Sequence, residues 1–390
     1  MRHSGRVTEV HLVAGTRPEA IKLAPLVPAL RAQGMTPVFV ASGQHPTMVH
    51  QALAAFGLEP DVTLRIDRGS GGQAELMAAL TARLETHWAR TPPDAVVVQG
   101  DTTTVLAAAM VAFWAQLPIA HVEAGLRSHD LSAPFPEEGN RRLVGQISRL
   151  HLAPTAEARA NLEREGAQPD HIVVTGNTVI DAVLGIAARG EPIGDPRVSG
   201  FVARARSGAS RLVLVTAHRR ESWGEPLDRV LSAVLLLLDK YSDVEVVLPA
   251  HPNPAVAQQV RAALGAHPRV LVTEPLAYPV LVATLAAATL VLSDSGGIQE
   301  EAPSFGVPVI VLREVTERME AVHAGCAVLV GTDRDAVLAH ACRLLDDPDE
   351  RAAMVARGNP FGDGEAAQRC AAAIAWMLGR AERLPAEFRF

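Results

Sequence analysis

The sequence predicts an α/β protein built from two doubly wound, Rossmann-like domains. Short apolar runs rich in β-branched residues recur along the chain, separated by helical stretches rich in Ala and Leu. The runs are nearly continuously apolar instead of alternating, which is typical of parallel strands covered by helices on both faces. The length of 390 residues also exceeds what one hydrophobic core usually serves, so two domains are expected.

The predicted strands form two successive series of about six, each alternating with helices. The first series is 10–14, 38–41, 95–99, 119–123, 150–153 and 172–175, and the second is 212–216, 244–248, 270–273, 290–293, 309–312 and 328–330. Between them, Gly190–Ser210 has the composition of a surface loop. We place the hinge just after Asn177, which predicts domains at 1–177 and 178–363 and a final helix within 364–390. The spacing of the predicted elements does not show to which of the two domains that helix belongs.

The composition indicates a globular protein of the reducing cytoplasm. The net charge of −7 disfavours nucleic-acid binding, so an anionic ligand needs a local basic site. Cys326, Cys342 and Cys370 are odd in number and form no CxxC pair, which argues against a disulfide framework or a structural zinc site. The N-terminus shows no signal-peptide pattern, and the apolar stretch Leu276–Leu292 is better explained by a helix followed by a strand than by a membrane span.

Basic residues follow the first predicted strand. Ligands of open parallel sheets bind beyond the carboxyl ends of the strands, and this strand ends in Gly-Thr-Arg-Pro-Glu (15–19), with Lys22 one turn further. Gly15 permits a tight turn and Pro18 suits the first turn of a helix. Arg17 and Lys22 then add cations to a helix N-terminus that already favours anions. The alternative is a plain helix start with solvated charges.

Carboxylates follow three further segments of the first half. Asp101 comes directly after the third strand, where capping the next helix would also explain it. Glu123 lies at the end of the fourth strand, where an unpaired buried charge is costly, and Glu137 and Glu138 lie in the loop 134–142. Carboxylates that converge on one site acquire different pKa values and can serve as acid and base. A metal site is the rival interpretation, which the absence of ligand spacing disfavours.

The second half offers a site for a nucleotide. One strand runs into His218 in the segment Ala-His-Arg-Arg-Glu (217–221), and another into Ser-Asp-Ser-Gly-Gly (293–297). Ser295, Gly296 and Gly297 would expose consecutive backbone N–H groups to a phosphate, and Glu301 could bind the hydroxyls of a ribose. A Gly-rich turn with a Glu-rich helix start is the plainer explanation. The sequence has no GxGxxG and no GxxxxGK[ST], which disfavours nicotinamide enzymes and P-loop phosphotransferases.

Taken together, these motifs resemble those of the UDP-N-acetylglucosamine 2-epimerases, and the match runs in order over about residues 10 to 365. The resemblance implies the two-domain GT-B-like fold with the active site in the cleft between the domains, a homodimer, and a C-terminal helix that returns to the N-terminal domain. The motifs are Gly-Thr-Arg-Pro-Glu-Ala-Ile-Lys (15–22), Gly-Asp-Thr-Thr-Thr (100–104), His-Val-Glu-Ala-Gly-Leu-Arg (121–127), Pro-Glu-Glu-Gly-Asn-Arg (136–141), Thr-Gly-Asn-Thr-Val-Ile-Asp (175–181), Ala-His-Arg-Arg-Glu (217–221) and Ser-Asp-Ser-Gly-Gly-Ile-Gln-Glu-Glu-Ala-Pro (293–303).

The resemblance implies reversible conversion of UDP-GlcNAc to UDP-ManNAc, with no cofactor and no metal. UDP is eliminated across C1–C2 to leave a 2-acetamidoglucal, and UDP then re-adds with C2 inverted. The implied roles are acid/base catalysis for Asp101, Glu123 and Glu137, and a place beside the leaving diphosphate for His218. The implied substrate-binding residues are Arg17, Lys22, Arg141, Ser295, Gly296, Gly297 and Arg318 for phosphates and anions, and Glu301 for the ribose.

Some positions concern a second, activating UDP-GlcNAc that bacterial members of the family bind. Gln44 and His45 keep the Gln-His pair that helps to hold it, and Arg68 and His251 are further candidates. Thr47 stands where a longer polar side chain is expected, so regulation is less securely implied than catalysis. Gln99 stands where the family often has His, and Met319 where Pro is common.

Three other functions stay open. A hydrolysing 2-epimerase would release ManNAc and UDP, which the retained Gln44-His45 pair disfavours. A GT-B glycosyltransferase would share the fold and the UDP site, but three carboxylates in the first half favour elimination chemistry. A catalytically idle nucleotide-sugar-binding protein would not need the acid/base set. Fold alone does not decide among them.

Overall fold

The computed structural model describes residues 7–66, 69, 71–219 and 222–390, which form two compact units. The first unit comprises the described residues up to Ala182 together with Phe361–Phe390, and the second comprises Val183–Pro360. The division falls inside α8 (Thr178–Arg189) and just before Phe361, whereas the sequence analysis places the boundaries after residues 177 and 363.

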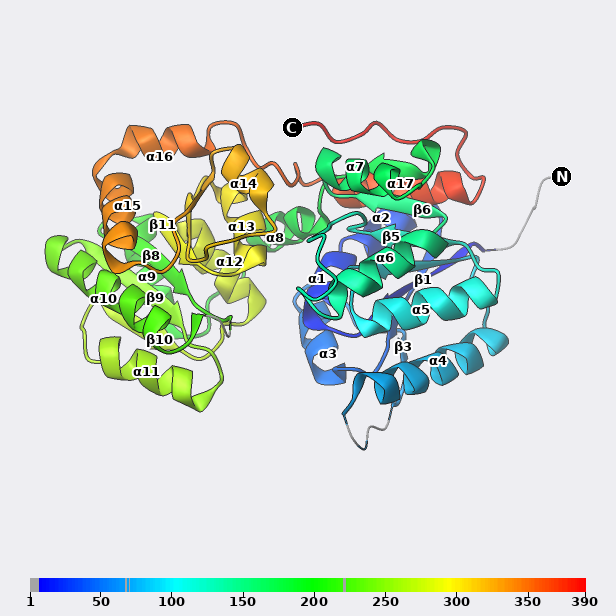
Figure 1. Ribbon diagram of the computed structural model, residues 1–390, viewed down its shortest axis with the longest axis horizontal. Coiled ribbons are helices and arrows are strands. Elements are labelled where there is room, and N and C mark those ends of the chain that lie inside the picture. Colours follow the sequence, from blue (N-terminus) through cyan, green and yellow to red (C-terminus); the bar gives the residue numbers. More distant parts are fainter. Residues whose placement is uncertain (1–6, 67–68, 70, 220–221) are drawn as a thin grey trace. The chain divides into compact units, whose positions relative to one another are not determined.

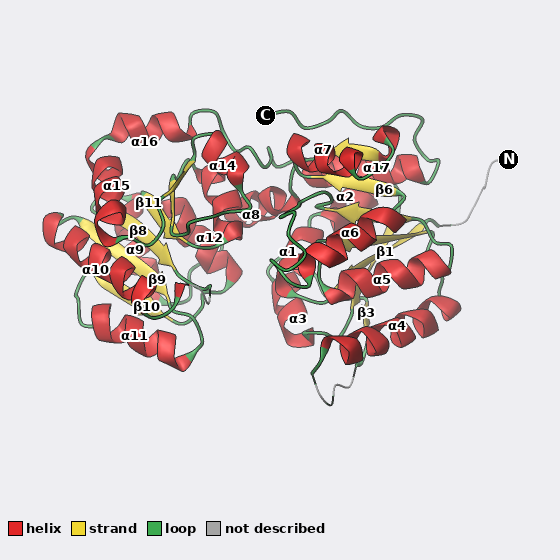
Figure 2. Ribbon diagram, in the orientation of Figure 1, coloured by secondary structure: helices red, strands yellow, loops and turns green. Residues whose placement is uncertain are grey.

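The first unit contains a parallel sheet of seven strands in the order β3-β2-β1-β4-β5-β6-β7 (Figures 1 and 2). Its register pairs Leu12 of β1 with Phe39 of β2 on one side and with Val97 of β4 on the other. The short edge strand β3 is absent from the predicted series. The strands are β1 (Glu9–Ala14), β2 (Thr36–Ala41), β3 (Val62–Thr63), β4 (Ala95–Gln99), β5 (Ile119–Val122), β6 (Leu150–Ala153) and β7 (Ile172–Val174).

Helices cover both faces of this sheet, which is why its strands are continuously apolar: Val96, Val97 and Val98 of β4 are all fully buried. The helices are α1 (Arg17–Leu23), α2 (Leu26–Ala32), α3 (Pro46–Ala54), α4 (Gln73–Arg90), α5 (Thr103–Trp114), α6 (Glu137–Ile147), α7 (Ala156–Arg164), the 3-10 helix η1 (Pro169–His171) and α17 (Ala366–Met377).

The C-terminal segment belongs to the first unit. Helix α17 packs against α2 and β6, and its first N–H groups, those of Ala366 and Ala367, donate to the Asp181 carboxylate at 3.1 and 2.8 Å (Figure 1). Beyond the helix, the Phe388 N–H donates to the Val174 carbonyl at 2.8 Å. Burial raises the pKa of Asp181 to about 6, although the backbone hydrogen bonds oppose the shift.

The second unit contains a parallel sheet of six strands in the order β10-β9-β8-β11-β12-β13. Leu214 of β8 pairs with Val291 of β11, and both side chains are fully buried. The strands are β8 (Arg211–Thr216), β9 (Val244–Pro249), β10 (Val270–Thr273), β11 (Leu290–Ser293), β12 (Val309–Val311) and β13 (Ala327–Leu329). The helices are α9 (Pro196–Arg206), α10 (Glu225–Lys240), α11 (Pro254–Leu264), α12 (Tyr278–Ala287), α13 (Gly296–Glu301), the 3-10 helix η3 (Ala302–Phe305), α14 (Met319–His323), α15 (Arg334–Asp346) and α16 (Pro348–Val355).

Two expectations about the second unit meet different outcomes. The apolar stretch Leu276–Leu292 forms helix α12 and strand β11 as predicted, and no helix within the described ranges is long and apolar enough to cross a membrane. The prediction of a loop over Gly190–Ser210 is wrong, because α9 occupies the middle of this segment. Asp195 caps that helix by accepting from the Arg197 N–H, and Val198 and Val202, one turn apart, are buried.

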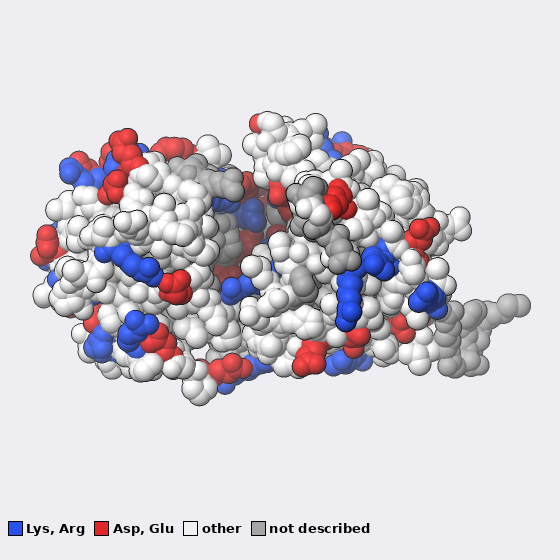
Figure 3. Space-filling view, turned by 90° about the horizontal axis from the view of Figure 1, so that it is seen from below, with Lys and Arg blue, Asp and Glu red and all other residues white. Residues whose placement is uncertain are grey.

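Charged side chains of both signs are interspersed over the visible face of each unit (Figure 3). Exposed pairs of this kind contribute little to stability. Partly buried pairs are more informative, because taking charges out of water is costly. Lys22–Glu123 and Arg318–Glu300 are two such pairs, with side-chain exposures of 13% and 6% and of 14% and 1%. Each pair contains predicted functional residues, namely Lys22 and Glu123 in the first and Arg318 in the second.

Candidate functional site

The loops that carry Arg17 and Asp101 in the first unit, and His218 and Ser295 in the second, lie at the point in each sheet where the strand order reverses. In the first unit this point falls between β1 and β4, and in the second between β8 and β11. The loops that leave two such neighbouring strands diverge to opposite faces and leave a crevice for a ligand beyond the strand ends. Residues 15–16 and 100–102 leave the first pair of strands, and residues 217–219 and 294–295 leave the second.

The loop after β1 is held by Glu19, a residue that the sequence analysis leaves without a function. Its carboxylate accepts from the N–H groups of Gly15 and Thr16 at 2.6 and 2.8 Å and from the Thr102 hydroxyl. The pattern Thr16-x-x-Glu19 forms a capping box, and this pattern is the sequence signal from which the role of Glu19 could have been predicted. Gly15 is required because a Cβ there would collide with the Thr104 and Ser42 side chains. Burial raises the pKa of Glu19 to about 7, against the effect of the three hydrogen bonds.

Glu123 follows β5 directly and has a left-handed backbone conformation, with φ of 62°. Such a conformation is uncommon outside glycine and clusters at functional sites. Both carboxylate oxygens contact the Lys22 ammonium, at 2.8 and 2.7 Å, and Oε2 also accepts from the Gln99 amide. Lys22, predicted to bind phosphate, therefore pairs with the predicted catalytic carboxylate of Glu123. The Gln99 amide orients this carboxylate.

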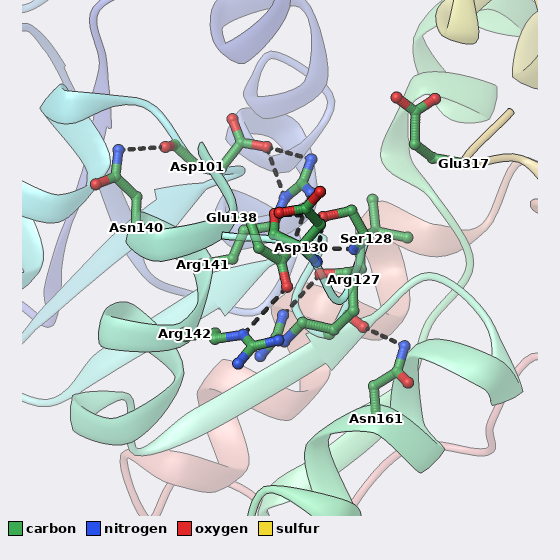
Figure 4. A network of polar contacts seen from close by, with 12 residues as sticks. Asp101, Arg127, Ser128, Asp130, Glu138, Asn140, Arg141, Arg142, Asn161 and Glu317 are labelled. Carbon is green, nitrogen blue, oxygen red and sulfur yellow. Dashed lines mark hydrogen bonds and ion pairs between the residues drawn. The ribbon is translucent and has the colours of Figure 1, made fainter. Parts of the chain in front are cut away.

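Asp101 is bound on both its side chain and its backbone by α6 (Figure 4). The Arg141 guanidinium contacts the carboxylate at 2.7 and 2.8 Å, and the Asn140 amide donates to the Asp101 carbonyl at 2.8 Å. Asp101 therefore does not cap α5, whose N-cap is Thr102. Arg141, predicted as an anion contact, instead joins Asp101 to Glu138, which it meets at 3.4 Å.

The two adjacent glutamates at the start of α6 have different surroundings. Glu138 is fully buried and accepts from the Ser128 N–H at 3.0 Å and from Arg142 at 3.1 Å. Burial would raise its pKa, but the Ser128 N–H and the neighbouring arginines outweigh this effect and lower it. Glu137 is half-buried at the first position of the helix. Glu138 is thus built into the scaffold, whereas Glu137 is partly exposed to solvent.

In the second unit, Asp294 holds the loop that carries His218. The fully buried Asp294 carboxylate accepts from the N–H groups of His218 and Arg219, each at 3.0 Å, and from the Ser222 hydroxyl at 2.8 Å. The His218 ring lies 5.9 Å from that of His251. Burial lowers the pKa of His218, and His251 adds to this shift while Asp294 opposes it. The sequence analysis quotes Asp294 within a motif but assigns it no role.

The predicted phosphate and ribose contacts gather around α13. Ser295 is its N-cap, Gly296 its first residue and Glu301 its last. The Arg318 guanidinium lies beside Gly296, where a Cβ would stand 3.6 Å from its central carbon. Arg318 is held there by the buried Glu300, which accepts from Nε at 2.6 Å. A small residue, a helix start and an arginine thus combine into a site suited to an anion.

The residues predicted for a second, activating ligand are divided between the units. Gln44 lies just before α3, where its side-chain oxygen accepts from the Thr104 hydroxyl at 2.7 Å, and the exposed His45 is the N-cap of that helix. His251 lies in the second unit, between the rings of His218 and Trp223. Arg68 falls outside the described residues.

The structure brings together the predicted residues within each unit. Two ion pairs, Lys22–Glu123 and Arg141–Asp101, lie beyond β1, β4 and β5, and α6 carries Glu137 next to Asn140 and Arg141. Residues that the sequence analysis missed, namely Glu19, Gln99, His121, Asn140 and Asp294, all bind to predicted residues or to their loops. Among the residues that the structure describes, no group of three His, Cys, Asp or Glu side chains is placed to hold a metal ion.

Comparison with known proteins gives one consistent result. Residues 28–375 match the family model described as UDP-N-acetylglucosamine 2-epimerase. The UDP-N-acetylglucosamine 2-epimerase of Bacillus subtilis is 41% identical over 383 residues, covering 97% of this chain and 98% of the relative. An MnaA–UDP co-structure from S. aureus has 39% identity and a TM-score of 0.87, covering 98% of this chain and all of that one. The UDP-GlcNAc 2-epimerase of Neisseria meningitidis bound to UDP-GlcNAc has 37% identity and a TM-score of 0.84, covering 96% of this chain and all of that one.

Proposed function

This chain belongs to the UDP-N-acetylglucosamine 2-epimerase family, and from that premise we propose that it interconverts UDP-GlcNAc and UDP-ManNAc without hydrolysing them. The observation that carries the proposal is the carboxylate network at the switch point of the first sheet, with Glu123 in a left-handed conformation and bound to Lys22. At the switch point of the second sheet, the start of α13 with Arg318 beside Gly296 supports the proposal, because these groups would suit a nucleotide diphosphate.

The reaction needs acid/base groups because the C2 proton of this sugar has no adjacent carbonyl to make it acidic. A carboxylate removes that proton, the C1–O bond to the diphosphate breaks, and the electron pair of the C2–H bond becomes the C1–C2 double bond of a 2-acetamidoglucal. UDP takes the electrons of the broken bond. In the return step UDP adds to C1 and a proton is delivered to the opposite face of C2, which inverts that centre. No hydride is transferred and no electrons are gained or lost.

We assign the proton transfers to Asp101, Glu123 and Glu137, with Arg141 and Lys22 as their counter-charges. His218, Ser295, Gly296, Gly297 and Arg318 would hold and stabilise the diphosphate, Glu301 would bind the ribose, and Arg17 would add a further cation. In this scheme Lys22 and Arg141 would contact substrate phosphate while keeping part of their contact with a carboxylate, because each is already bound to an acid/base carboxylate.

Two further features of the proposal concern the setting of the enzyme. We propose a homodimer, because the first unit exposes large hydrophobic side chains on the packed helices α5 and α6, namely Phe113, Trp114 and Leu143. Light scattering coupled to size exclusion should report twice the chain mass. We also place the reaction in the cytoplasm, where a reducing environment suits the free cysteines Cys326, Cys342 and Cys370.

The proposed function is tested by incubating the pure protein with UDP-GlcNAc in D2O, without added nicotinamide or metal, and following the sugar by NMR. We expect UDP-ManNAc to form with deuterium at C2. The carboxylic acid that delivers hydrogen to C2 exchanges its proton with the D2O solvent, so a deuteron is delivered. Free ManNAc as the main product would assign the chain to the hydrolysing 2-epimerases. Epimerisation with full retention of the C2 hydrogen would overturn the elimination mechanism, and no turnover without an acceptor would favour a glycosyltransferase.

A further inference from the structure

We propose that His121, Asn140 and Glu19 are positioning residues that together fix the loop Gly100–Thr102 and thereby hold Asp101 in its working orientation. The inference rests on the proposed role of Asp101 in the epimerase reaction. It arises from one feature of the structure: three successive residues of this loop are each bound by a side chain from a different element. The three contacts run from β5 to Gly100, from α6 to Asp101 and from α1 to Thr102.

The contact of His121 is with the backbone immediately before Asp101. His121 lies in β5 and is 1% exposed, and its Nε2 donates to the Gly100 carbonyl at 2.7 Å. Because a carbonyl can only accept, Nε2 must carry the proton, which leaves Nδ1 bare in the neutral ring. Nδ1 is buried, and within the described part of the chain nothing binds it. A charged ring would place an N–H there without an acceptor, so the contact belongs to neutral His121.

The surroundings of His121 keep the ring neutral. Burial lowers the pKa of His121 to about 4, with Arg127 and Arg141 adding to the shift and the Gly100 carbonyl opposing it. His151, its register partner on β6, is also buried, and its pKa falls to about 3. A group that does not titrate near neutral pH is not a proton carrier there. His121 therefore serves the site through geometry.

The other two contacts complete the attachment of the loop. Asn140 of α6 donates to the Asp101 carbonyl at 2.8 Å and is itself buried (Figure 4). The Thr102 hydroxyl donates to Glu19 and accepts from the Val105 N–H at 3.4 Å as the N-cap of α5. Glu19 also holds the N–H groups of Gly15 and Thr16, so it ties the Asp101 loop to the loop that precedes Arg17.

Backbone hydrogen bonds hold this loop at its two ends, where the Gly100 N–H donates to the Val122 carbonyl and the Thr102 carbonyl accepts from the Leu106 N–H, each at 3.1 Å, and the side-chain contacts add to them. Gly100 has φ of 81°, a conformation that glycine adopts freely and leaves freely. The ion pair of Asp101 with Arg141 does not fix the loop by itself, since Arg141 also contacts Glu138 and must accommodate the substrate. None of the three proposed residues binds the Asp101 carboxylate. Their loss should misplace Asp101 while leaving its chemistry intact, and a displacement of about 1 Å at a reacting group can cost on the order of 10²-fold in rate.

The test compares variants that remove a contact with variants that keep it. His121→Met removes the donor, whereas His121→Gln keeps an N–H the same number of bonds from the backbone. His151→Met is the matched control, because His151 is equally buried in the neighbouring strand and no hydrogen bond joins it to the loop within the described residues. Thr102→Val and Thr102→Ser form a second pair of variants, which tests the hydrogen bond to Glu19. This pair also keeps the proposal testable if His121→Met does not fold.

We expect His121→Met and Thr102→Val to lower kcat by about 10-fold or more, with KM and the Kd for UDP changed by less than about 3-fold. His121→Gln and Thr102→Ser should recover most of the lost kcat, and His151→Met should resemble the wild type. Normal kcat in both disruptive variants, an equal loss in His151→Met, or no recovery in the conservative variants would overturn the proposal. Wild-type protein that fails to epimerise UDP-GlcNAc would instead overturn the proposed function.

Discussion

Glu123 and Asp101 show how much an individual side chain depends on its immediate partners. The Glu123 carboxylate is bound by Lys22 and Gln99, and the Asp101 carboxylate by Arg141, so each side chain is restrained by its partners. Fixed carboxylates of this kind are what proton transfer to and from carbon requires. The neutral amide of the same shape keeps the geometry and removes the acid/base function, which makes amide variants the sharpest probe at this scale.

We predict that Asp101→Asn, Glu123→Gln and Glu137→Gln each lower kcat by about 10²-fold or more, the usual scale of general acid–base catalysis. Binding of UDP, measured by calorimetry, should survive in all three, since we assign the nucleotide to residues of the second unit. Glu157→Gln, the same change on the exposed face of α7, is the control. Near wild-type turnover in any two of the three variants would mean that the acid/base set is wrongly assigned.

Glu19 leads to a prediction about pH. Burial raises its pKa from 4.5 to about 7, so the folded protein favours the protonated acid more than the unfolded chain does. The resulting stabilisation is complete below pH 4.5 and is lost as the pH rises to about 7. Relative to Glu19→Gln, whose side chain does not titrate, the wild type should lose roughly 3 kcal/mol of unfolding free energy across that range, at about 1.4 kcal/mol per pKa unit. Denaturant unfolding of both proteins at several pH values measures this, and a difference independent of pH would contradict it.

At the scale of elements, each ligand loop is held by a buried carboxylate from the neighbouring loop or helix. Glu19 joins the loops after β1 and β4, and Asp294 joins the loops after β8 and β11. These pairs of strands flank the switch point of each sheet, where the loops diverge to opposite faces. A carboxylate can accept several N–H and O–H groups at once, which suits it to this task.

We predict that Asp294→Ala weakens the binding of UDP by about 10-fold or more, because three donors of the His218 loop lose their acceptor. Ser222→Ala removes only one of the three bonds and should weaken binding by less than about 3-fold. Titration calorimetry with UDP gives both values, and circular dichroism checks that the variants are folded. Equal affinity in Asp294→Ala and the wild type would show that Asp294 does not organise the nucleotide site.

For the molecule as a whole, the proposed reaction would require both units, because the residues that we assign to acid/base chemistry belong to the first and most of those that we assign to the diphosphate belong to the second. The glycal and UDP must both be retained until they recombine, so retention is as necessary as chemistry. His218 is the residue of the second unit that we assign to the departing diphosphate, and its loss should affect retention as well as rate.

We therefore predict that His218→Ala releases more free 2-acetamidoglucal and UDP per epimerisation than the wild type does. NMR over a long incubation with UDP-GlcNAc follows all the products in one sample. Ser222→Ala, which leaves the imidazole in place but removes one bond of its loop, is the control. A His218→Ala variant that is slower but shows the same ratio of glycal release to epimerisation would indicate that His218 does not help to retain the intermediate.

The fold class and most of the residues that form the charged pairs could be predicted from the amino-acid sequence. Continuous apolar runs follow from strands covered on both faces, and loop residues after strands meet because parallel strands share one carboxyl edge. Local composition was misleading at Gly190–Ser210, where the Asp-Pro start of α9 and its spaced valines outweigh the glycines and arginines. The two-residue strand β3 is too short to leave a pattern.

The pairing of these residues with one another could not be predicted from the sequence and became visible in the three-dimensional structure. Lys22 and Glu123 are 101 positions apart in the chain, and Arg141 and Asp101 are 40 apart, so no spacing rule predicts their pairing. The structure also separated Glu138, a buried scaffold residue, from its neighbour Glu137, and it revealed the supporting roles of His121, Asn140, Glu19 and Asp294. The physical reason is that hydrogen bonds are local in space, and strands or helices distant in sequence come within reach of one another only after the sheet has formed.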